Sequence, residues 1–143
     1  MQIADVLRGK AVGPDVATTT PAASVGELLE LLHRYNVGAL PVVDGGELVG
    51  IVSERDVVRK LHERGRDLLD ATVADLMTAD VVTCSPRDQA ADLARVMTDR
   101  RIRHLPVCDD RGLIGIVSIG DLVKARIDQL ENEREQLASY INS

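Results

Sequence analysis

The chain has 143 residues, of which 45% are hydrophobic and only two, both tyrosines, are aromatic, and its formal net charge is −6. That length suits one compact domain whose core is built from valine, leucine, isoleucine and alanine. The acidic balance and the scarcity of stacking aromatics argue against nucleic-acid binding, and no apolar run reaches the roughly 18–20 residues of a membrane-spanning helix. Residues 1–5 lack the basic and apolar regions of a signal peptide, so we expect a cytoplasmic protein.

The first half of the chain predicts a helical turn followed by one unit of strands and helices. We expect, in order, a turn of helix over residues 3–7, a brief strand over 16–20, a helix over 24–36, a hairpin of strands 40–43 and 48–52, and a helix over 53–64. Pro21 ends the brief strand, and Ser24 with Glu27 forms a capping box at the start of the first long helix.

The second half repeats the first at a constant offset of 65 residues, which carries Pro41 to Pro106 and Asp56 to Asp121. An internal period of about 60 residues indicates a duplicated structural unit. We expect a turn of helix over residues 73–77, a strand over 81–84, a helix over 88–100, a hairpin of strands 105–108 and 113–117, and a final helix from 118 to about 140. Because each unit would be marginal alone, the two are predicted to share a core.

The expected fold class is α/β (α+β), with the order strand, helix, strand, strand, helix in each repeat. Residues 1–65 form the first repeat with its lead-in, 66–126 the linker and second repeat, and 127–143 a helical extension. The two lead-ins match at an offset of 70 rather than 65. The first repeat therefore carries five extra residues, near Gly9-Lys10 and Gly13-Pro14.

The last helix outlasts its counterpart by about two turns and carries an apolar stripe with a four-three spacing. Arg134 interrupts this stripe, which consists of Val123, Ile127, Leu130, Leu137 and Ile141. The stripe is compatible with a short coiled coil between chains and equally with a tail packed along its own domain.

The motif Gly-Ile-Val-Ser-x-x-Asp occurs at residues 50–56 and again at 115–121. Ser-x-x-Asp after a strand is a capping box, which by itself explains both residues. The same placement also suits ligand binding, because a helix N-terminus attracts phosphate and a carboxylate one turn into the helix can accept both hydroxyls of a ribose. The residues alone leave both interpretations open.

The remaining reactive residues do not indicate catalysis or a metal. Cys84 and Cys108 correspond to Thr19 and Val43 of the first repeat, which favours small buried residues in strands. The three histidines show no spacing that gathers metal ligands with the cysteines. No nucleophile has a recognisable base, and no Gly-x-x-x-x-Gly-Lys loop is present, so we expect no enzyme.

The order and equal spacing of several short motifs resemble a pair of CBS domains, the modules named after cystathionine β-synthase. These motifs are the doubled Leu-Pro-Val-x-Asp, the doubled Gly-Ile-Val-Ser-x-x-Asp, Thr-x-x-Pro before each helix, and Ala-Asp-Leu-Met-Thr in the linker. The resemblance covers about residues 1–126 and is nearest to stand-alone bacterial CBS pairs. It implies two pseudo-twofold related repeats packed sheet to sheet, with adenosine nucleotides bound in two clefts between them.

The resemblance also implies two sets of ligand-binding residues. Asp56 and Asp121 would hold ribose, with Ser53 and Ser118 near phosphate. Facing Asp56 we expect Thr83, Ile102, Arg103 and His104, and facing Asp121 we expect Thr18, Val37, Gly38 and Ala39. The two clefts should differ, because Arg55, Arg103 and His104 suit phosphate at the first, whereas Gly120 and Gly38 leave the second roomier and uncharged.

We therefore expect a nucleotide-sensing regulatory module with an AMP, ATP or NAD type of ligand and no required cofactor. The alternative is a structural or protein-interaction adaptor whose clefts are empty. A homodimer is expected, formed through the helices as in the family and with residues 122–141 taking part.

Overall fold

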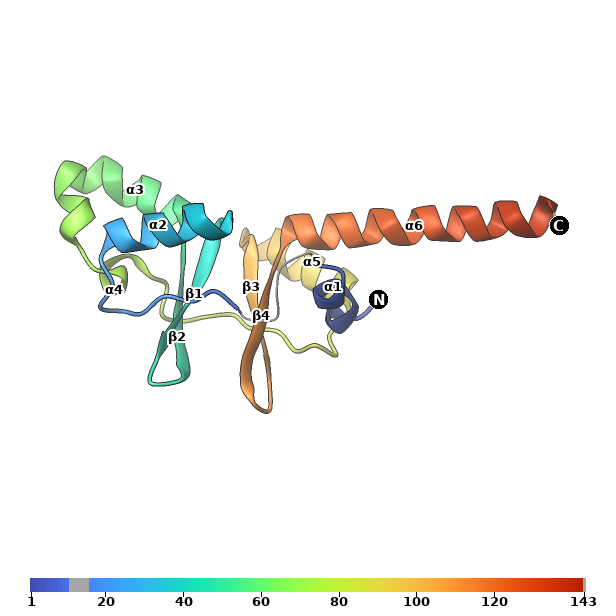
Figure 1. Ribbon diagram of the computed structural model, residues 1–143, viewed down its shortest axis with the longest axis horizontal. Helices are drawn as coiled ribbons and strands as arrows, with labels where there is room; N and C mark the ends of the chain where they lie inside the picture. The colour runs from blue at the N-terminus through green and yellow to red at the C-terminus, as the bar shows by residue number, and fades with distance from the viewer. Residues whose placement is uncertain (11–15, 143) are drawn as a thin grey trace.

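The structure, a computed structural model, describes residues 1–10 and 16–142 and contains the same arrangement twice (Figure 1). The first half contains α1 (Ile3–Arg8), α2 (Val25–Tyr35), β1 (Ala39–Asp44), β2 (Glu47–Ser53), α3 (Glu54–Arg64) and a 3-10 helix, η1 (Gly65–Asp70). The second half contains α4 (Val73–Leu76), α5 (Ala90–Arg100), β3 (His104–Asp109), β4 (Gly112–Ser118) and α6 (Ile119–Asn142). These bounds confirm the predicted mixed α/β fold, its long helices and its hairpins. The predicted insertion at Gly13-Pro14 lies outside the described residues.

The two hairpins are antiparallel and share one register. Ala39 pairs with Ser53 in the first, and His104 pairs with Ser118 in the second. Each hairpin has one register shift at the same place, between Val42 and Val43 in the first hairpin and between Val107 and Cys108 in the second. Each motif serine therefore lies opposite the first residue of its hairpin, at the point where a helix begins.

The predicted opening strands over residues 16–20 and 81–84 are wrong in extent. Each is reduced to one parallel bridge, Thr19 with Val42 and Cys84 with Val107. Thr19 donates its backbone N–H to the Pro41 carbonyl at 3.0 Å and accepts from the Val43 N–H at 2.9 Å, which uses both of its backbone groups. The chain turns away directly afterwards, at residues 21 and 86, so the pairing extends no further.

The short lead-in helices are exchanged between the repeats. α1 precedes the first repeat, yet its fully buried Ile3 belongs to the core of the second, together with Met97 and Leu105. α4 precedes the second repeat, yet its fully buried Val73 belongs to the core of the first. Equivalent backbone bonds anchor both helices, from Ile3 to the Asp88 carbonyl at 2.9 Å and from Val73 to the Ala23 carbonyl at 2.8 Å.

The glycine that opens each repeated motif lies under the end of a lead-in segment. A Cβ atom at Gly50 would lie 2.7 Å from the Met77 sulfur and 3.0 Å from the Thr78 carbonyl oxygen. A Cβ atom at Gly115 would lie 2.9 Å from a methyl group of Leu7. The motif begins with glycine because a neighbouring segment crosses the strand at that point.

The two halves meet through their hairpins, as the resemblance predicts. β2 contacts β4, and the hairpins lie side by side at the centre of the molecule with α3 and α4 outside one and α1 and α5 outside the other (Figure 1). The buried residues form one separate cluster in each half, so the prediction of a shared core is wrong. This arrangement places the carboxyl ends of β2 and β4, where the motif serines lie, near the boundary between the halves.

α6 leaves the body of the molecule as one continuous helix, which confirms the predicted extension (Figure 1). Its apolar stripe is uncovered within the described chain, because Val123 is 53%, Ile127 50% and Leu137 64% exposed. Of the two alternatives that the sequence left open, a stripe packed along its own domain is therefore wrong. No helix among residues 1–10 and 16–142 is both long and apolar enough to cross a membrane.

Candidate functional site

Both Ser-x-x-Asp motifs form the predicted capping boxes. The Ser53 N–H donates to Asp56 Oδ2 at 2.8 Å, and the Asp56 N–H donates to Ser53 Oγ at 3.3 Å. At the second motif the corresponding distances between Ser118 and Asp121 are 2.9 and 3.0 Å. These bonds satisfy backbone donors that the first turn of a helix otherwise leaves free.

Capping occupies only one side of the Asp56 carboxylate. Oδ2 accepts from the Ser53 N–H and from the Ser53 hydroxyl, the latter at 3.1 Å, whereas Oδ1 accepts no hydrogen bond from the residues that the structure describes. Asp56 is half-buried, at the first turn of α3. One carboxylate oxygen thus remains available to a ligand while the cap is intact.

Asp56 lines a cleft of about 800 Å³ whose walls come from both repeats. This volume is within the range of small-molecule sites. Six of the residues predicted for this cleft border it, namely Ser53, Arg55, Asp56, Ile102, Arg103 and His104. α3 supplies one wall, and the segment that joins α5 to β3 supplies the other.

The cleft is strongly cationic, although the whole chain is acidic. Five arginines line it against two carboxylates, those of Glu54 and Asp56; the arginines are Arg55, Arg59, Arg100, Arg101 and Arg103. None of the five forms an ion pair with any residue that the structure describes. Unpaired guanidinium groups around one cleft favour an anionic ligand.

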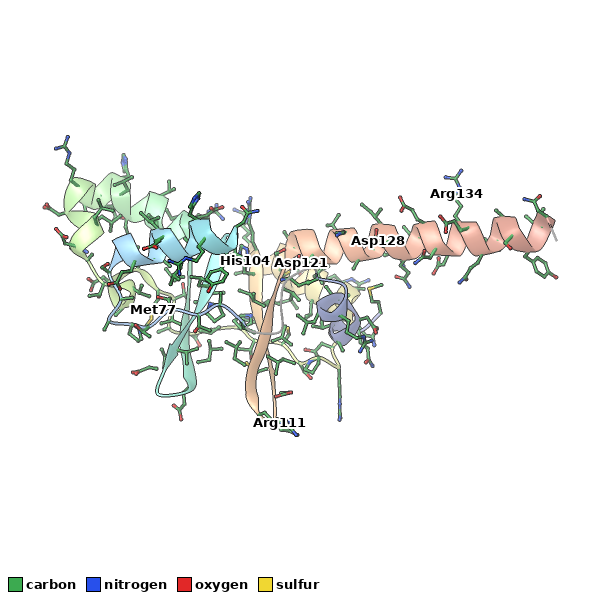
Figure 2. All side chains as sticks on the ribbon, in the orientation of Figure 1. Met77, His104, Arg111, Asp121, Asp128 and Arg134 are labelled. Atoms are coloured by element: carbon green, nitrogen blue, oxygen red, sulfur yellow. The ribbon has the colours of Figure 1, made fainter. Side chains whose placement is uncertain are left out.

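His104 lies close to Asp121 at the centre of the molecule, where α6 begins (Figure 2). Burial lowers the pKa of His104; the charges of Asp121 and Glu54 oppose this shift, and those of Lys10 and Arg103 add to it. The side chain is therefore neutral at neutral pH, and it lies on the wall of the cleft, where a bound anion would favour its protonation.

Several predicted residues are placed differently from the expectation. Thr83 is exposed and is absent from the lining of the Asp56 cleft, where Thr78 is found instead, held beside Ile51 by the linker. Gly38 and Ala39 line the Asp56 cleft, because β1 begins beside Ser53 and the Gly38 carbonyl accepts from the first N–H of α3 at 2.9 Å.

The surroundings of Asp121 also differ from the prediction. Asp121 borders a cavity of about 500 Å³ between α1 and α6, and neither Thr18 nor Val37 lines it. Thr18 is exposed and Val37 packs against the core of the first repeat. Gly120 lies two residues after Ser118 in the first turn of α6, and among the described residues a Cβ atom there would have only the Ser118 hydroxyl within 4 Å, at 3.6 Å.

The predicted absence of charge at Asp121 is wrong, because the Lys10 ammonium lies 2.9 Å from Asp121 Oδ2. Burial raises the pKa of Asp121, but the hydrogen bonds from the Ser118 backbone and from Lys10 outweigh it, so the pKa lies below its ordinary value. The carboxylate is ionised at neutral pH and is already paired with a cation.

Comparison with known proteins identifies this architecture. A family model described as "CBS domain" matches residues 4–63 and 73–128, which together are more than half of the chain. The chain belongs to the CBS domain family. The resemblance predicted from the repeated motifs is confirmed, and the two matches correspond to the two repeats around the central hairpins.

Relatives of known sequence and structure share the paired CBS arrangement. The mitochondrial CBS domain-containing protein CBSX3 from Arabidopsis thaliana is 38% identical over 146 residues, which span 97% of this chain and 71% of that protein. The CBS-domain containing protein ATU1752 from Agrobacterium tumefaciens is 40% identical with a TM-score of 0.83, covering 88% of this chain and 99% of that chain. The CBS pair of MJ0100, solved with 5′-methylthioadenosine and S-adenosyl-L-methionine, is 27% identical with a TM-score of 0.76, covering 87% of this chain and 98% of that chain.

Sequence reasoning missed part of the cationic lining of this CBS pair. Arg59 lies four residues after Arg55, a spacing that places both on one side of α3. Arg100 and Arg101 form a visible basic run with Arg103, but only the fold brings that run opposite α3. Glu54, the remaining acidic residue of the lining, was also absent from the prediction.

The cysteines of this CBS pair are placed as small buried residues rather than as nucleophiles. Cys84 is buried, Cys108 is half-buried, and both are free thiols. Burial and the charge of Asp88 raise the pKa of Cys84 to about 12. The Cys84 thiol is therefore protonated at neutral pH and unreactive.

Proposed function

We propose that the protein is a regulatory module that senses an adenosine-containing nucleotide by binding it in the Asp56 cleft. The observation that carries this proposal is the combination, in one cleft, of a carboxylate oxygen left free by its helix cap with five unpaired arginines. A ribose diol is a partner for the first feature, and a phosphate group is a partner for the second.

Each residue of the cleft has a distinct role in this proposal. Asp56 accepts from the ribose hydroxyls, and the Ser53 hydroxyl with the start of α3 faces phosphate. Arg55 and Arg103 neutralise the phosphate charge from two sides, and His104 adds a positive charge when the bound anion favours its protonation. The adenine ring lies against the apolar lining, to which Ile102 contributes.

Ligand binding in this cleft would act on the packing of the two repeats. The cleft is walled by α3 of the first repeat and by residues 100–104 of the second, so a bound nucleotide touches both. A ligand shifts a conformational equilibrium to the extent that it binds one state more tightly than another. The regulated property is therefore the relative arrangement of the halves, or the surface that they present to a partner.

The family supports a regulatory rather than a catalytic function. CBS pairs are generally regulatory modules that bind adenosine-containing ligands, and the related pair of MJ0100 was solved with two such ligands. The particular ligand of this chain, of the AMP, ATP or NAD type, is part of the proposal. Thr83, Thr18 and Val37 remain candidate contacts only after rearrangement, because they do not line the cleft as it stands.

The decisive experiment is calorimetry with adenosine, AMP, ATP, NAD and S-adenosylmethionine. Because the arginines and His104 stabilise an anion, we expect AMP to bind at least about tenfold more tightly than adenosine, or ~1.4 kcal/mol, with the difference shrinking as salt is added. Equal affinities of adenosine and AMP would contradict the assignment of the phosphate subsite.

The substitution Asp56→Asn separates ligand binding from capping. An amide oxygen can still accept the Ser53 N–H, but the amide serves a ribose diol less well, so nucleotide affinity should fall at least tenfold while the melting temperature changes little. Asp75→Asn is the matched control, because Asp75 occupies the same position in the capping box of α4, outside the cleft. Unchanged affinity with a lowered melting temperature would show that Asp56 only caps its helix.

A second candidate function, protein interaction, rests on the uncovered stripe of α6. Val123, Ile127 and Leu130 are each about half exposed on one side of a helix that extends beyond the body of the molecule. We propose that two copies of the chain bury this stripe as a homodimer, since monomers seldom expose large apolar patches. An adaptor with empty clefts would dimerise in the same way but would gain no thermal stability from any nucleotide.

A further inference from the structure

The Asp121 site contains a cation supplied by the chain itself. Lys10 Nζ lies 2.9 Å from Asp121 Oδ2 and donates a hydrogen bond to the Ile116 carbonyl oxygen at 2.7 Å. The two paired side chains are only 24% and 27% exposed. The ammonium group is thus held at two points, one on the motif carboxylate and one on the backbone of β4.

The first repeat satisfies the equivalent atoms in a different way. Ile51 corresponds to Ile116, and its carbonyl accepts from the backbone N–H of Thr78 at 2.9 Å. At Asp56 the second donor to Oδ2 is the neutral Ser53 hydroxyl, at 3.1 Å. The isoleucine carbonyl therefore meets a backbone amide in the first repeat and an ammonium group in the second, and only at Asp121 does the motif carboxylate form an ion pair within the described residues.

The two lead-ins bring different groups to their hairpins. Lys10 lies just beyond α1, in the stretch where the first repeat has five more residues than the second. Thr78, which follows α4 in the linker, pairs with Ile51 of β2 in one antiparallel bridge. The N-terminal lead-in thus brings a long basic side chain to the place where the linker brings a backbone amide.

We propose that Lys10 closes the Asp121 cleft to nucleotides and so determines that each chain binds a single nucleotide, at Asp56. A ribose diol that donates one hydroxyl to each oxygen of the Asp121 carboxylate meets Lys10 at Oδ2. Such a ligand must therefore break a largely buried ion pair and leave the ammonium group without its carboxylate partner. The inference rests on the proposed function for its account of Asp56, but the closure of Asp121 is tested separately.

The test is calorimetric titration of the full chain with adenosine and with AMP, comparing the wild type with Lys10→Met. Methionine keeps an unbranched side chain of similar length and removes the charge. We expect the variant to gain a second site, or to tighten a weak second site at least tenfold. The double variant Lys10→Met with Asp121→Asn should lose that site again.

The matched control is Lys124→Met. Lys124 lines the same cavity, but it forms no ion pair with Asp121 among the described residues, so its replacement changes the charge there without freeing the carboxylate. This control should keep the wild-type number of sites.

The outcomes separate this inference from the proposed function. A wild-type chain that binds nothing, with a Lys10→Met variant that binds one ligand through Asp121, would refute the Asp56 proposal and support closure. Closure would be overturned if the wild type fills two sites, if Lys10→Met gains none, or if that variant binds AMP more weakly at Asp121, as a lysine that contacts phosphate would require.

Discussion

Ser53 and Asp56 combine capping and proposed recognition in the same few atoms. The cap uses Asp56 Oδ2 and the backbone of both residues, and it leaves Asp56 Oδ1 without a hydrogen bond from the described residues. The Ser53 hydroxyl is shared, since it accepts from the Asp56 N–H and donates to the carboxylate. The helix cap therefore holds the Asp56 carboxylate, the group proposed to bind the ligand, in place before any ligand arrives.

His104 should make stability depend on pH near neutrality. Because burial lowers its pKa in the folded state, the unfolded chain binds the proton more readily as the pH falls. The stabilisation is complete above the ordinary histidine value of about 6.5 and is lost as the pH falls toward the lower folded value. Between about pH 7.5 and pH 5.5, the wild type should lose more unfolding free energy than His104→Gln.

Urea denaturation at each pH measures this difference, and His62→Gln is the control, because His62 is exposed on α3. Parallel profiles for the wild type and His104→Gln would show that burial of His104 has no effect on its protonation.

Individual residues differ in how far the sequence alone could place them. Asp56 and Asp121 were predictable because the motif repeats at a constant offset. Lys10 was not, because it lies outside the repeated unit and its partner is more than a hundred positions away. Arg100 and Arg101 were visible as a basic run, but a run does not reveal that Arg55 lies across a cleft from it.

The elements were more predictable than the contacts between them. Capping boxes, hairpin turns and apolar spacing are local signals, and they located α2, α3 and both hairpins. The opening strands failed because β-branched composition at residues 16–20 indicates an extended chain, whereas the length of a strand depends on how long its neighbour runs alongside. The exchange of α1 and α4 left no local signal at all.

The crossings over Gly50 and Gly115 provide a test at the level of elements. Gly50→Ala places a methyl group against the backbone of Thr78 as well as Met77, and should lower the free energy of unfolding by about 1–3 kcal/mol. Gly115→Ala meets only the Leu7 side chain, which can rotate, so it should cost less. Urea denaturation measures both, and an equal or smaller loss at Gly50 would contradict the backbone contact.

At the scale of the whole molecule, α6 extends well beyond the two-repeat body (Figure 1). A chain that ends at Arg126 lacks Ile127, Leu130 and the rest of the stripe, so its dimer should be weaker than that of the full chain. Truncation need not abolish the dimer, because the resemblance also implies contacts through the helices of the repeats. Sedimentation equilibrium of the two chains measures the difference.

Two full-length variants refine that experiment. Leu130→Ser changes the stripe, whereas Glu131→Ser changes the neighbouring exposed residue on the same helix. Only the first should weaken association. A full-length monomer at micromolar concentration would refute the homodimer, and equal dimer affinities for full and truncated chains would refute the role of the stripe.

The exchange of α1 and α4 determines the order in which the chain can be completed during synthesis. Val73 follows the first repeat closely, so that half can close its core soon after its own residues leave the ribosome. Ile3 can be buried only after Met97, Leu105 and Leu122, which form its core, have been synthesised. α1 is thus synthesised long before the core that buries it, and the core of the second half is completed by a helix that precedes the first half.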